Sequence, residues 1–107
     1  MPSKLIDPYT AVADPTRRSI LEMLRDEQPL AAGDIARRFP RVSRAAVSKH
    51  LGVLRRSRLV RAQHRGRENL YRLEARRISE IMDWLNSLAP AYEQALERLK
   101  QRAERDE

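Results

Sequence analysis

The sequence of 107 residues predicts a mostly α-helical fold with a small β-hairpin, arranged as a winged helix-turn-helix in one domain. Residues 31–57 carry two short helical patterns with a proline between them, as expected for a helix-turn-helix. Residues 58–73 then change to the period-two pattern of a hairpin, which we call the wing. Because a domain of this size has a small core, we expect it to dimerise through residues 1–13 and 75–105.

Two helical segments are expected ahead of residue 31. Asp14 can cap a helix and Pro15 suits the first helical position, so a helix should run from there to about Asp26. A shorter amphipathic segment precedes it, and Pro8 either starts or interrupts that segment. Its apolar residues recur at helical spacing and are Leu5, Ile6, Tyr9 and Val12.

The helix-turn-helix itself is predicted from two apolar stripes. The first helix should cover Ala32 to Phe39 and end at Pro40, with inward positions Ile35, Ala36 and Phe39. Ser43 then caps a second helix, whose apolar residues Val47, Leu51 and Leu54 are spaced by four and three. This second helix is the candidate recognition helix.

The polar face of that helix has the composition expected for contact with nucleic acid. Small side chains at Ala45 and Ser48 let the backbone approach the bases, while Arg44 and Lys49 can reach phosphates or a guanine edge. An ordinary solvent-exposed face is the alternative. The residues we predict to contact duplex DNA, including those of the wing, are Ser43, Arg44, Ala45, Ser48, Lys49, His50, Arg55, Arg65 and Arg67.

The wing is predicted from strand alternation on both sides of a glycine turn. Arg65-Gly66-Arg67 supplies the turn because glycine takes a positive φ readily, and Tyr71 and Leu73 should point inward on the return strand. Arginines at such a tip suit a minor groove or adjacent phosphates. A plain surface hairpin remains the alternative.

The charge of the chain is concentrated in this region. Residues 37–72 hold twelve Lys and Arg residues against one acid, Glu68, which gives a local net charge of +11. The remainder has ten basic and fourteen acidic residues, a net charge of −4. A basic region beside an acidic remainder is typical of a protein that neutralises phosphates, whereas evenly scattered charge mainly serves solubility.

The last segment predicts a long amphipathic helix from Ala75, although Pro90 leaves open whether it is one kinked helix or two. Its apolar stripe needs a partner surface, and the first helix is a plausible second contributor to a two-fold interface. Packing of the stripe on its own domain is the alternative. The predicted homodimer interface consists of Leu5, Tyr9, Ile78, Ile81, Trp84, Leu85, Leu88 and Tyr92.

Composition argues against several other classes. The chain has no cysteine, no apolar run of membrane-spanning length and no long apolar segment of the secretory type in residues 1–9, so we expect a cytoplasmic protein without disulfides. Its only histidines, His50 and His64, have no cysteine to form a metal site with. Ser48 and His50 point in different directions on a helix, which argues against an enzyme. No cofactor is predicted.

Five motifs in order resemble the ArsR family of bacterial winged-helix repressors, over most of the chain. They are ADPTRRSIL (13–21), GDIARRF (33–39), VSRAAVSKHLGVL (42–54), LV (59–60) and RGRENLYRL (65–73). The resemblance implies a homodimeric repressor with the first and last helices at the interface, a recognition helix from about Ser43 and a wing around Gly66. The chain lacks the cysteines and the His and carboxylate sets of metal-sensing members, and is most similar to the cysteine-free, SdpR-like autorepressor kind.

The sequence therefore predicts a transcriptional regulator, in the first place a repressor, that binds double-stranded DNA at a palindromic operator as a homodimer. A non-specific architectural DNA-binding protein or an RNA-binding protein could use the same basic face. The aromatic residues lie mostly at core-like positions, which argues against a stacking platform for single strands. The operator, the regulated genes, any small-molecule effector and the choice between repression and activation are not encoded in these patterns.

Overall fold

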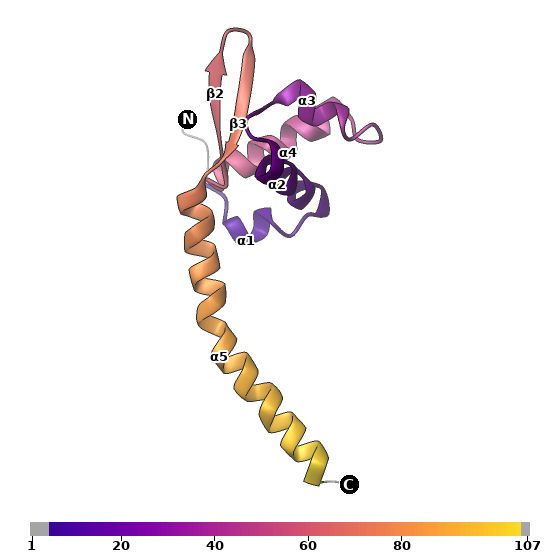
Figure 1. Ribbon diagram of the computed structural model, residues 1–107. Helices are drawn as coiled ribbons and strands as arrows, with labels where there is room; N and C mark the ends of the chain where they lie inside the picture. The colour runs from indigo at the N-terminus through magenta and orange to yellow at the C-terminus, as the bar shows by residue number, and fades with distance from the viewer. Residues whose placement is uncertain (1–4, 106–107) are drawn as a thin grey trace.

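The computed structural model describes residues 5–105, and Figure 1 shows a helical body with a projecting hairpin and one long C-terminal helix that leaves the body. Residues 1–4 of the predicted 1–13 segment lie outside the described residues. In chain order the elements are α1 (Pro8–Ala11), α2 (Pro15–Glu27), β1 (Leu30–Ala31), α3 (Ala32–Arg37), α4 (Arg44–Arg56), β2 (Val60–Arg65), β3 (Glu68–Leu73) and α5 (Ala75–Arg105).

Aspartate–proline pairs start the first two helices. The Asp14 side chain accepts a hydrogen bond of 3.0 Å from the Arg17 backbone N–H, and α2 begins at Pro15 as predicted. Asp7 caps α1 in the same way, so Pro8 starts that helix and does not interrupt it. The first helix is thus only four residues long, and Leu5 and Ile6 precede it.

Three strands form an antiparallel sheet in the order β1-β3-β2, which adds one strand to the predicted hairpin. The hairpin pairs from Val60 with Leu73 to Arg65 with Glu68. On the other side of β3, Leu30 pairs with Tyr71 and Ala31 with Leu70. The strand before α3 therefore anchors the wing to the helix-turn-helix.

The core lies where α2, α3 and α4 meet the base of the sheet. The predicted inward residues of α4 are buried, as is Ile35 of α3. Phe39 is only half-buried and lies outside α3, because that helix ends at Arg37 and not at Pro40. The fully or almost fully buried apolar residues are Ala11, Ile20, Leu24, Ile35, Val47, Leu51, Leu54, Leu59 and Val60.

The long C-terminal helix α5 continues without a break through Pro90, which settles the question of one helix or two. Its 31 residues span about 46 Å at the usual helical rise. The chain measures 66 × 30 × 27 Å, and its radius of gyration of 18.6 Å exceeds the value of about 13 Å for a compact chain of this length. No residue of α5 is buried.

Candidate nucleic-acid interface

The recognition helix α4 is oriented by burial on one side. The hydroxyl of Ser43 accepts a hydrogen bond of 3.0 Å from the Ala46 N–H, which caps the helix as predicted. The buried face of α4 forms part of the core and consists of Val47, Leu51 and Leu54. The opposite side is open, and the predicted contact residues that lie exposed on it are Ser43, Arg44, Ala45, Ser48 and Lys49.

The base of the wing borders the start of this helix. A hollow of about 210 Å³ is lined by Arg44 and Ser48 of α4, together with Asn69 of β3 and the small residue Gly33 of α3. Asn69 was not among the predicted contacts. Its side-chain oxygen lies 2.6 Å from the ring Nδ1 of His64, its partner across the hairpin. Asn69 is two residues before the buried Tyr71 and so lies on the same face of β3, and this spacing could have indicated that it borders the helix-turn-helix.

The wing tip is a two-residue turn that needs a glycine. Arg65 and Glu68 form the last strand pair, which leaves Gly66 and Arg67 as the turn. Gly66 has φ +63°, at the first turn position where type II′ hairpins favour glycine. Arg65 and Arg67 are exposed. Arg67 also lines a second hollow, of about 310 Å³, with Arg37 of α3, and the acids Asp34 and Glu68 line it too, so the tip and the helix-turn-helix meet there at a border of mixed charge.

Two of the predicted contacts lie away from that surface. Arg55 is exposed at the last turn of α4, where it lines a hollow with Arg58 and Arg61 at the outer edge of the sheet. His50 is directed toward α2 and only 20% of its side chain is exposed, so it does not share the open face of α4. The spacing already contained this signal, because His50 is three residues after Val47 and four before Leu54, on the buried stripe.

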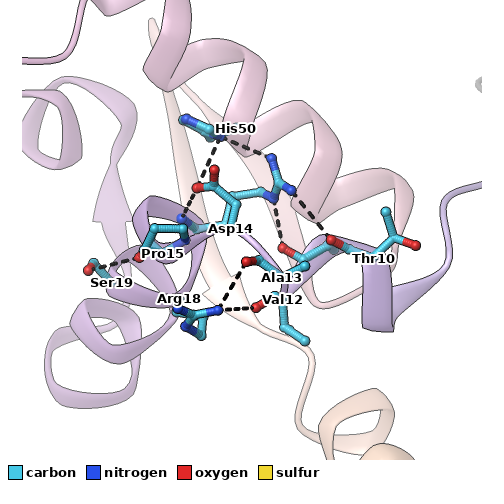
Figure 2. A network of polar contacts seen from close by, with 10 residues as sticks. Thr10, Val12, Ala13, Asp14, Pro15, Arg18, Ser19 and His50 are labelled. Atoms are coloured by element: carbon cyan, nitrogen blue, oxygen red, sulfur yellow. Dashed lines mark hydrogen bonds and ion pairs between the residues drawn. The ribbon is translucent and has the colours of Figure 1, made fainter.

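A polar network surrounds His50, and Figure 2 shows its ring beside Asp14 at the start of α2. The His50 Nδ1 lies 3.2 Å from a terminal nitrogen of Arg17 and 3.9 Å from a carboxylate oxygen of Asp14. The hydrogen bond from the Arg17 backbone N–H, assisted by the positive charge of the Arg17 guanidinium, holds the pKa of Asp14 below its ordinary value. The carboxylate is therefore ionised at neutral pH.

The predicted dimer residues divide into two groups. Ile78 and Ile81 are half-buried and pack against the core of their own chain, so they are not available as fully exposed contacts. The stripe therefore packs on its own domain only in the first turns of α5. The remaining predicted residues are 39–65% exposed, and they are Leu5, Tyr9, Trp84, Leu85, Leu88 and Tyr92.

The first and last helices nevertheless contact each other within one chain. The rings of Tyr9 and Trp84 pack with centroids 4.8 Å apart and planes tilted by 50°. Exposed apolar side chains continue along α5 at Leu96 and Leu99. A long apolar strip thus runs from α1 to the far end of α5.

The described residues carry neither a metal-ligating cluster nor a membrane-spanning helix. Over residues 5–105, no group of three or more His, Cys, Asp or Glu side chains is placed to hold a metal ion. In the same range, no helix has the length and apolar character that crossing a bilayer requires.

Comparison with known proteins gives relatives that cover most of the chain. A family model described as a helix-turn-helix domain matches residues 12–63. The HTH-type transcriptional regulator Rv2034 of Mycobacterium tuberculosis is 48% identical over 66 residues, which are 62% of this chain and 60% of that protein. The transcriptional repressor SdpR of Bacillus subtilis is 31% identical over 77 residues, which are 72% of this chain and 83% of the repressor.

Solved structures give the same result. An ArsR-like transcriptional regulator from Rhodococcus sp. RHA1 has a TM-score of 0.68 and 33% identity, covering 87% of this chain and 86% of its own. The ArsR family transcriptional regulator RHA00566 has a TM-score of 0.71 and 27% identity, covering 79% and 91%. These relatives are described as transcriptional regulators or repressors, which agrees with the sequence-based argument against an enzyme.

Proposed function

This chain belongs to the ArsR family of winged helix-turn-helix transcriptional regulators, and on that premise we propose that it binds duplex DNA and represses transcription. The observation that carries the proposal is the exposed, capped and basic start of α4 beside a wing with arginines at its tip. Repression is favoured over activation because the relative SdpR is described as a transcriptional repressor.

The proposed contacts divide by what they can read. Ala45 and Ser48 have short side chains on the open face of α4, which lets the helix approach base edges in a major groove. Lys49 and Arg44 flank them and can contact a guanine or a phosphate. Arg65 and Arg67 at the wing tip would contact the adjacent groove or backbone, which contributes affinity with little dependence on sequence.

We propose a homodimer that binds an imperfect palindrome. A two-fold axis would place two recognition helices in successive major grooves about 34 Å apart. The exposed strip of α1 and α5 supports this, because apolar surface of such length is rarely left in water by a monomer. Occlusion of a promoter would then repress transcription, and the upstream DNA of the protein's own gene is the first candidate operator.

The proposal includes a cytoplasmic location, because that is where bacterial chromosomal DNA lies. It assigns no metal and no cofactor to the protein.

The decisive experiment is a binding titration on the upstream DNA and on operators selected from a random duplex library, with unrelated duplex as competitor. The proposal predicts that operator affinity exceeds random-duplex affinity by roughly a thousandfold or more, at each of two salt concentrations. It also predicts a footprint with two-fold symmetry. Binding that competitor removes from every selected sequence would instead favour an architectural DNA-binding protein.

A further inference from the structure

The recognition helix is tied to the segments that carry the predicted dimer contacts. At its C-terminal end, the Ile6 N–H donates a hydrogen bond of 3.1 Å to the Arg56 carbonyl. The Arg77 Nε, from the first turn of α5, donates one of 3.4 Å to the Ser57 carbonyl. These two contacts fix the C-terminal end of α4, whereas its N-terminal half is held by the packing of Val47 and Leu51 in the core.

A third connection lies midway along α4 and is made by one guanidinium group. The Arg17 Nε donates to the Ala11 carbonyl at 2.7 Å, and its Nη2 donates to the Thr10 carbonyl at 3.4 Å. Its Nη1 lies 3.2 Å from the His50 Nδ1. Because the guanidinium is planar and rigid, its contacts with α1 and with α4 are geometrically coupled.

The chemistry of the contact defines the state of the histidine. Arginine can only donate, so the His50 Nδ1 must accept, and the neutral ring then carries its proton on Nε2. Asp14 helps to hold Arg17 in place, since its carboxylate accepts a hydrogen bond of 3.0 Å from the Arg17 backbone N–H. The ring is only 20% exposed, which limits competition from water.

The neighbouring arginine provides an internal comparison. The Arg18 Nη1 donates to the Val12 carbonyl at 2.9 Å and to the Ala13 carbonyl at 3.1 Å, as Figure 2 shows. Two consecutive arginines thus donate hydrogen bonds to four successive backbone carbonyls at and after the end of α1. In the hydrogen bonds of the described chain, only the first of them also reaches α4.

We propose that Arg17, acting through His50, is a positioning residue that sets the orientation of the recognition helix relative to the dimer-forming helices. The consequence is selectivity for the spacing between two half-sites, because two helices must enter grooves at one fixed separation. A small rotation of α4 about its tethered end would move its first turn, where the candidate base contacts lie. This inference rests on the proposed function.

The test compares Arg17→Gln with Arg18→Gln, which remove the same charge and the same kind of carbonyl contact. Both variants should lose similar, small amounts of affinity for random duplex. Only Arg17→Gln should lose about tenfold or more in the ratio of operator to random-duplex affinity, and should discriminate less against operators with one base pair added or removed between half-sites. Equal specificity losses in the two variants would overturn the proposal.

Substitution of the histidine tests the same contact from the other side. His50→Asn keeps an acceptor near the position of Nδ1 and should retain most of the specificity, whereas His50→Leu should behave like Arg17→Gln. The double variant of Arg17→Gln and His50→Leu should lose no more than either alone, because the two residues act as one unit. Additive losses would contradict the proposal, and thermal unfolding of each variant identifies any loss of fold.

A readout without DNA separates this inference from the proposed function. The ¹⁵N NMR spectrum of the His50 imidazole should show the Nε2–H tautomer in the wild type and in Arg18→Gln, and a mixture of tautomers in Arg17→Gln. Identical tautomers in all three would overturn the contact itself. Absence of any preferred operator for the wild type would count against the proposed function, while the spectrum would still decide whether Arg17 holds His50.

Discussion

The winged region, residues 15–73, and helix α5 differ in how far they bury their apolar side chains. Nearly all fully buried side chains of the chain belong to the winged region, where three helices close over the base of a sheet. Helix α5 buries none, and seven of its large apolar residues are 45–65% exposed. The first region buries its apolar residues within one chain, whereas the apolar surface of the second would be covered only in the proposed homodimer.

This difference separates two functions that share one small protein. The winged region carries the basic surface and can present it as a rigid unit. Helix α5 carries the apolar strip and would decide how two such units are placed. Substitutions in the two regions should therefore have different effects: those in the winged region should unfold the chain, and those in α5 should dissociate the proposed dimer.

The largest expected effect is loss of the core. Leu54→Ala in α4 removes a side chain with no exposed surface, which should lower the free energy of unfolding by about 2–5 kcal/mol because a cavity remains. Chemical denaturation monitored by circular dichroism measures it. A loss below about 1 kcal/mol would show that the winged region is not the tightly packed unit described above.

A charge on the strip should dissociate the dimer without unfolding the chain. Leu88→Glu places a carboxylate where apolar contact is proposed, and should weaken dimerisation by about 2 kcal/mol or more, a factor of thirty or greater. Sedimentation at micromolar concentration should show monomers. The matched control is Gln94→Glu, which makes the same charge change off the stripe, and a dimer that survives Leu88→Glu would reject the interface. Ile81→Glu is a poorer test because Ile81 packs on its own core.

Substitutions in the two parts of the proposed DNA-binding surface, α4 and the wing tip, should affect DNA affinity differently. Lys49→Ala on α4 should cost about 1–3 kcal/mol on the operator if this side chain reads a base. Arg67→Ala at the wing tip should weaken operator and random duplex alike, and should reduce the dependence of log affinity on log salt by about one. Titrations at several salt concentrations distinguish the two, and unchanged affinity in both variants would show that the assigned face is wrong.

A smaller effect is expected at the turn that joins the recognition helix to the wing. Arg58 has φ +63°, and the Leu59 N–H donates a hydrogen bond of 3.0 Å to the Leu54 carbonyl. This is the geometry of a Schellman cap, and Arg58 lies at the position that glycine usually occupies in that motif. Arg58→Gly should therefore stabilise the fold by up to about 1 kcal/mol, seen as a raised melting temperature. Arg58→Ala keeps the strain and loses the charge, so a rise of the same size in that control would assign the gain to charge.

The smallest expected effect concerns acid. The pKa of Asp14 lies below its ordinary value of 3.8, chiefly because the Arg17 backbone N–H bonds the carboxylate. Since the folded-state pKa is the lower one, the carboxylate stabilises the fold above the unfolded-state value, and this is lost as pH falls through the folded-state value. Asp14→Asn keeps a capping oxygen that does not titrate. Its unfolding free energy should therefore fall less than that of the wild type between about pH 5 and pH 2.

The sequence predicted the elements whose signals are local and repeated. The stripe of Val47, Leu51 and Leu54 predicted α4, the cap at Ser43 located its first residue, and the glycine turn located the wing. Strand β1 was missed because two residues carry no period, and their pairing with β3 depends on residues forty positions away. His50 was predicted among the DNA contacts although its spacing from Val47 and Leu54 sets it on the buried stripe, and its partner Arg17 is distant in sequence.

Proline gave the least certain signal. Pro15 and Pro8 start helices, as the position after a capping aspartate allows. Pro90 lies inside α5 without ending it. Proline at this position removes one backbone hydrogen bond, and on an exposed helix the freed carbonyl can bond to solvent; Figure 1 shows α5 curved but unbroken.

The most direct test of the account compares the wild type with Leu88→Glu on a full operator and on a single half-site. If α5 pairs two DNA-reading units, the wild type should bind the full operator far more tightly than the half-site. Leu88→Glu should bind both with the weak affinity that the wild type has for the half-site. Equal, tight binding of the full operator by both proteins would contradict the division of labour between the winged region and α5.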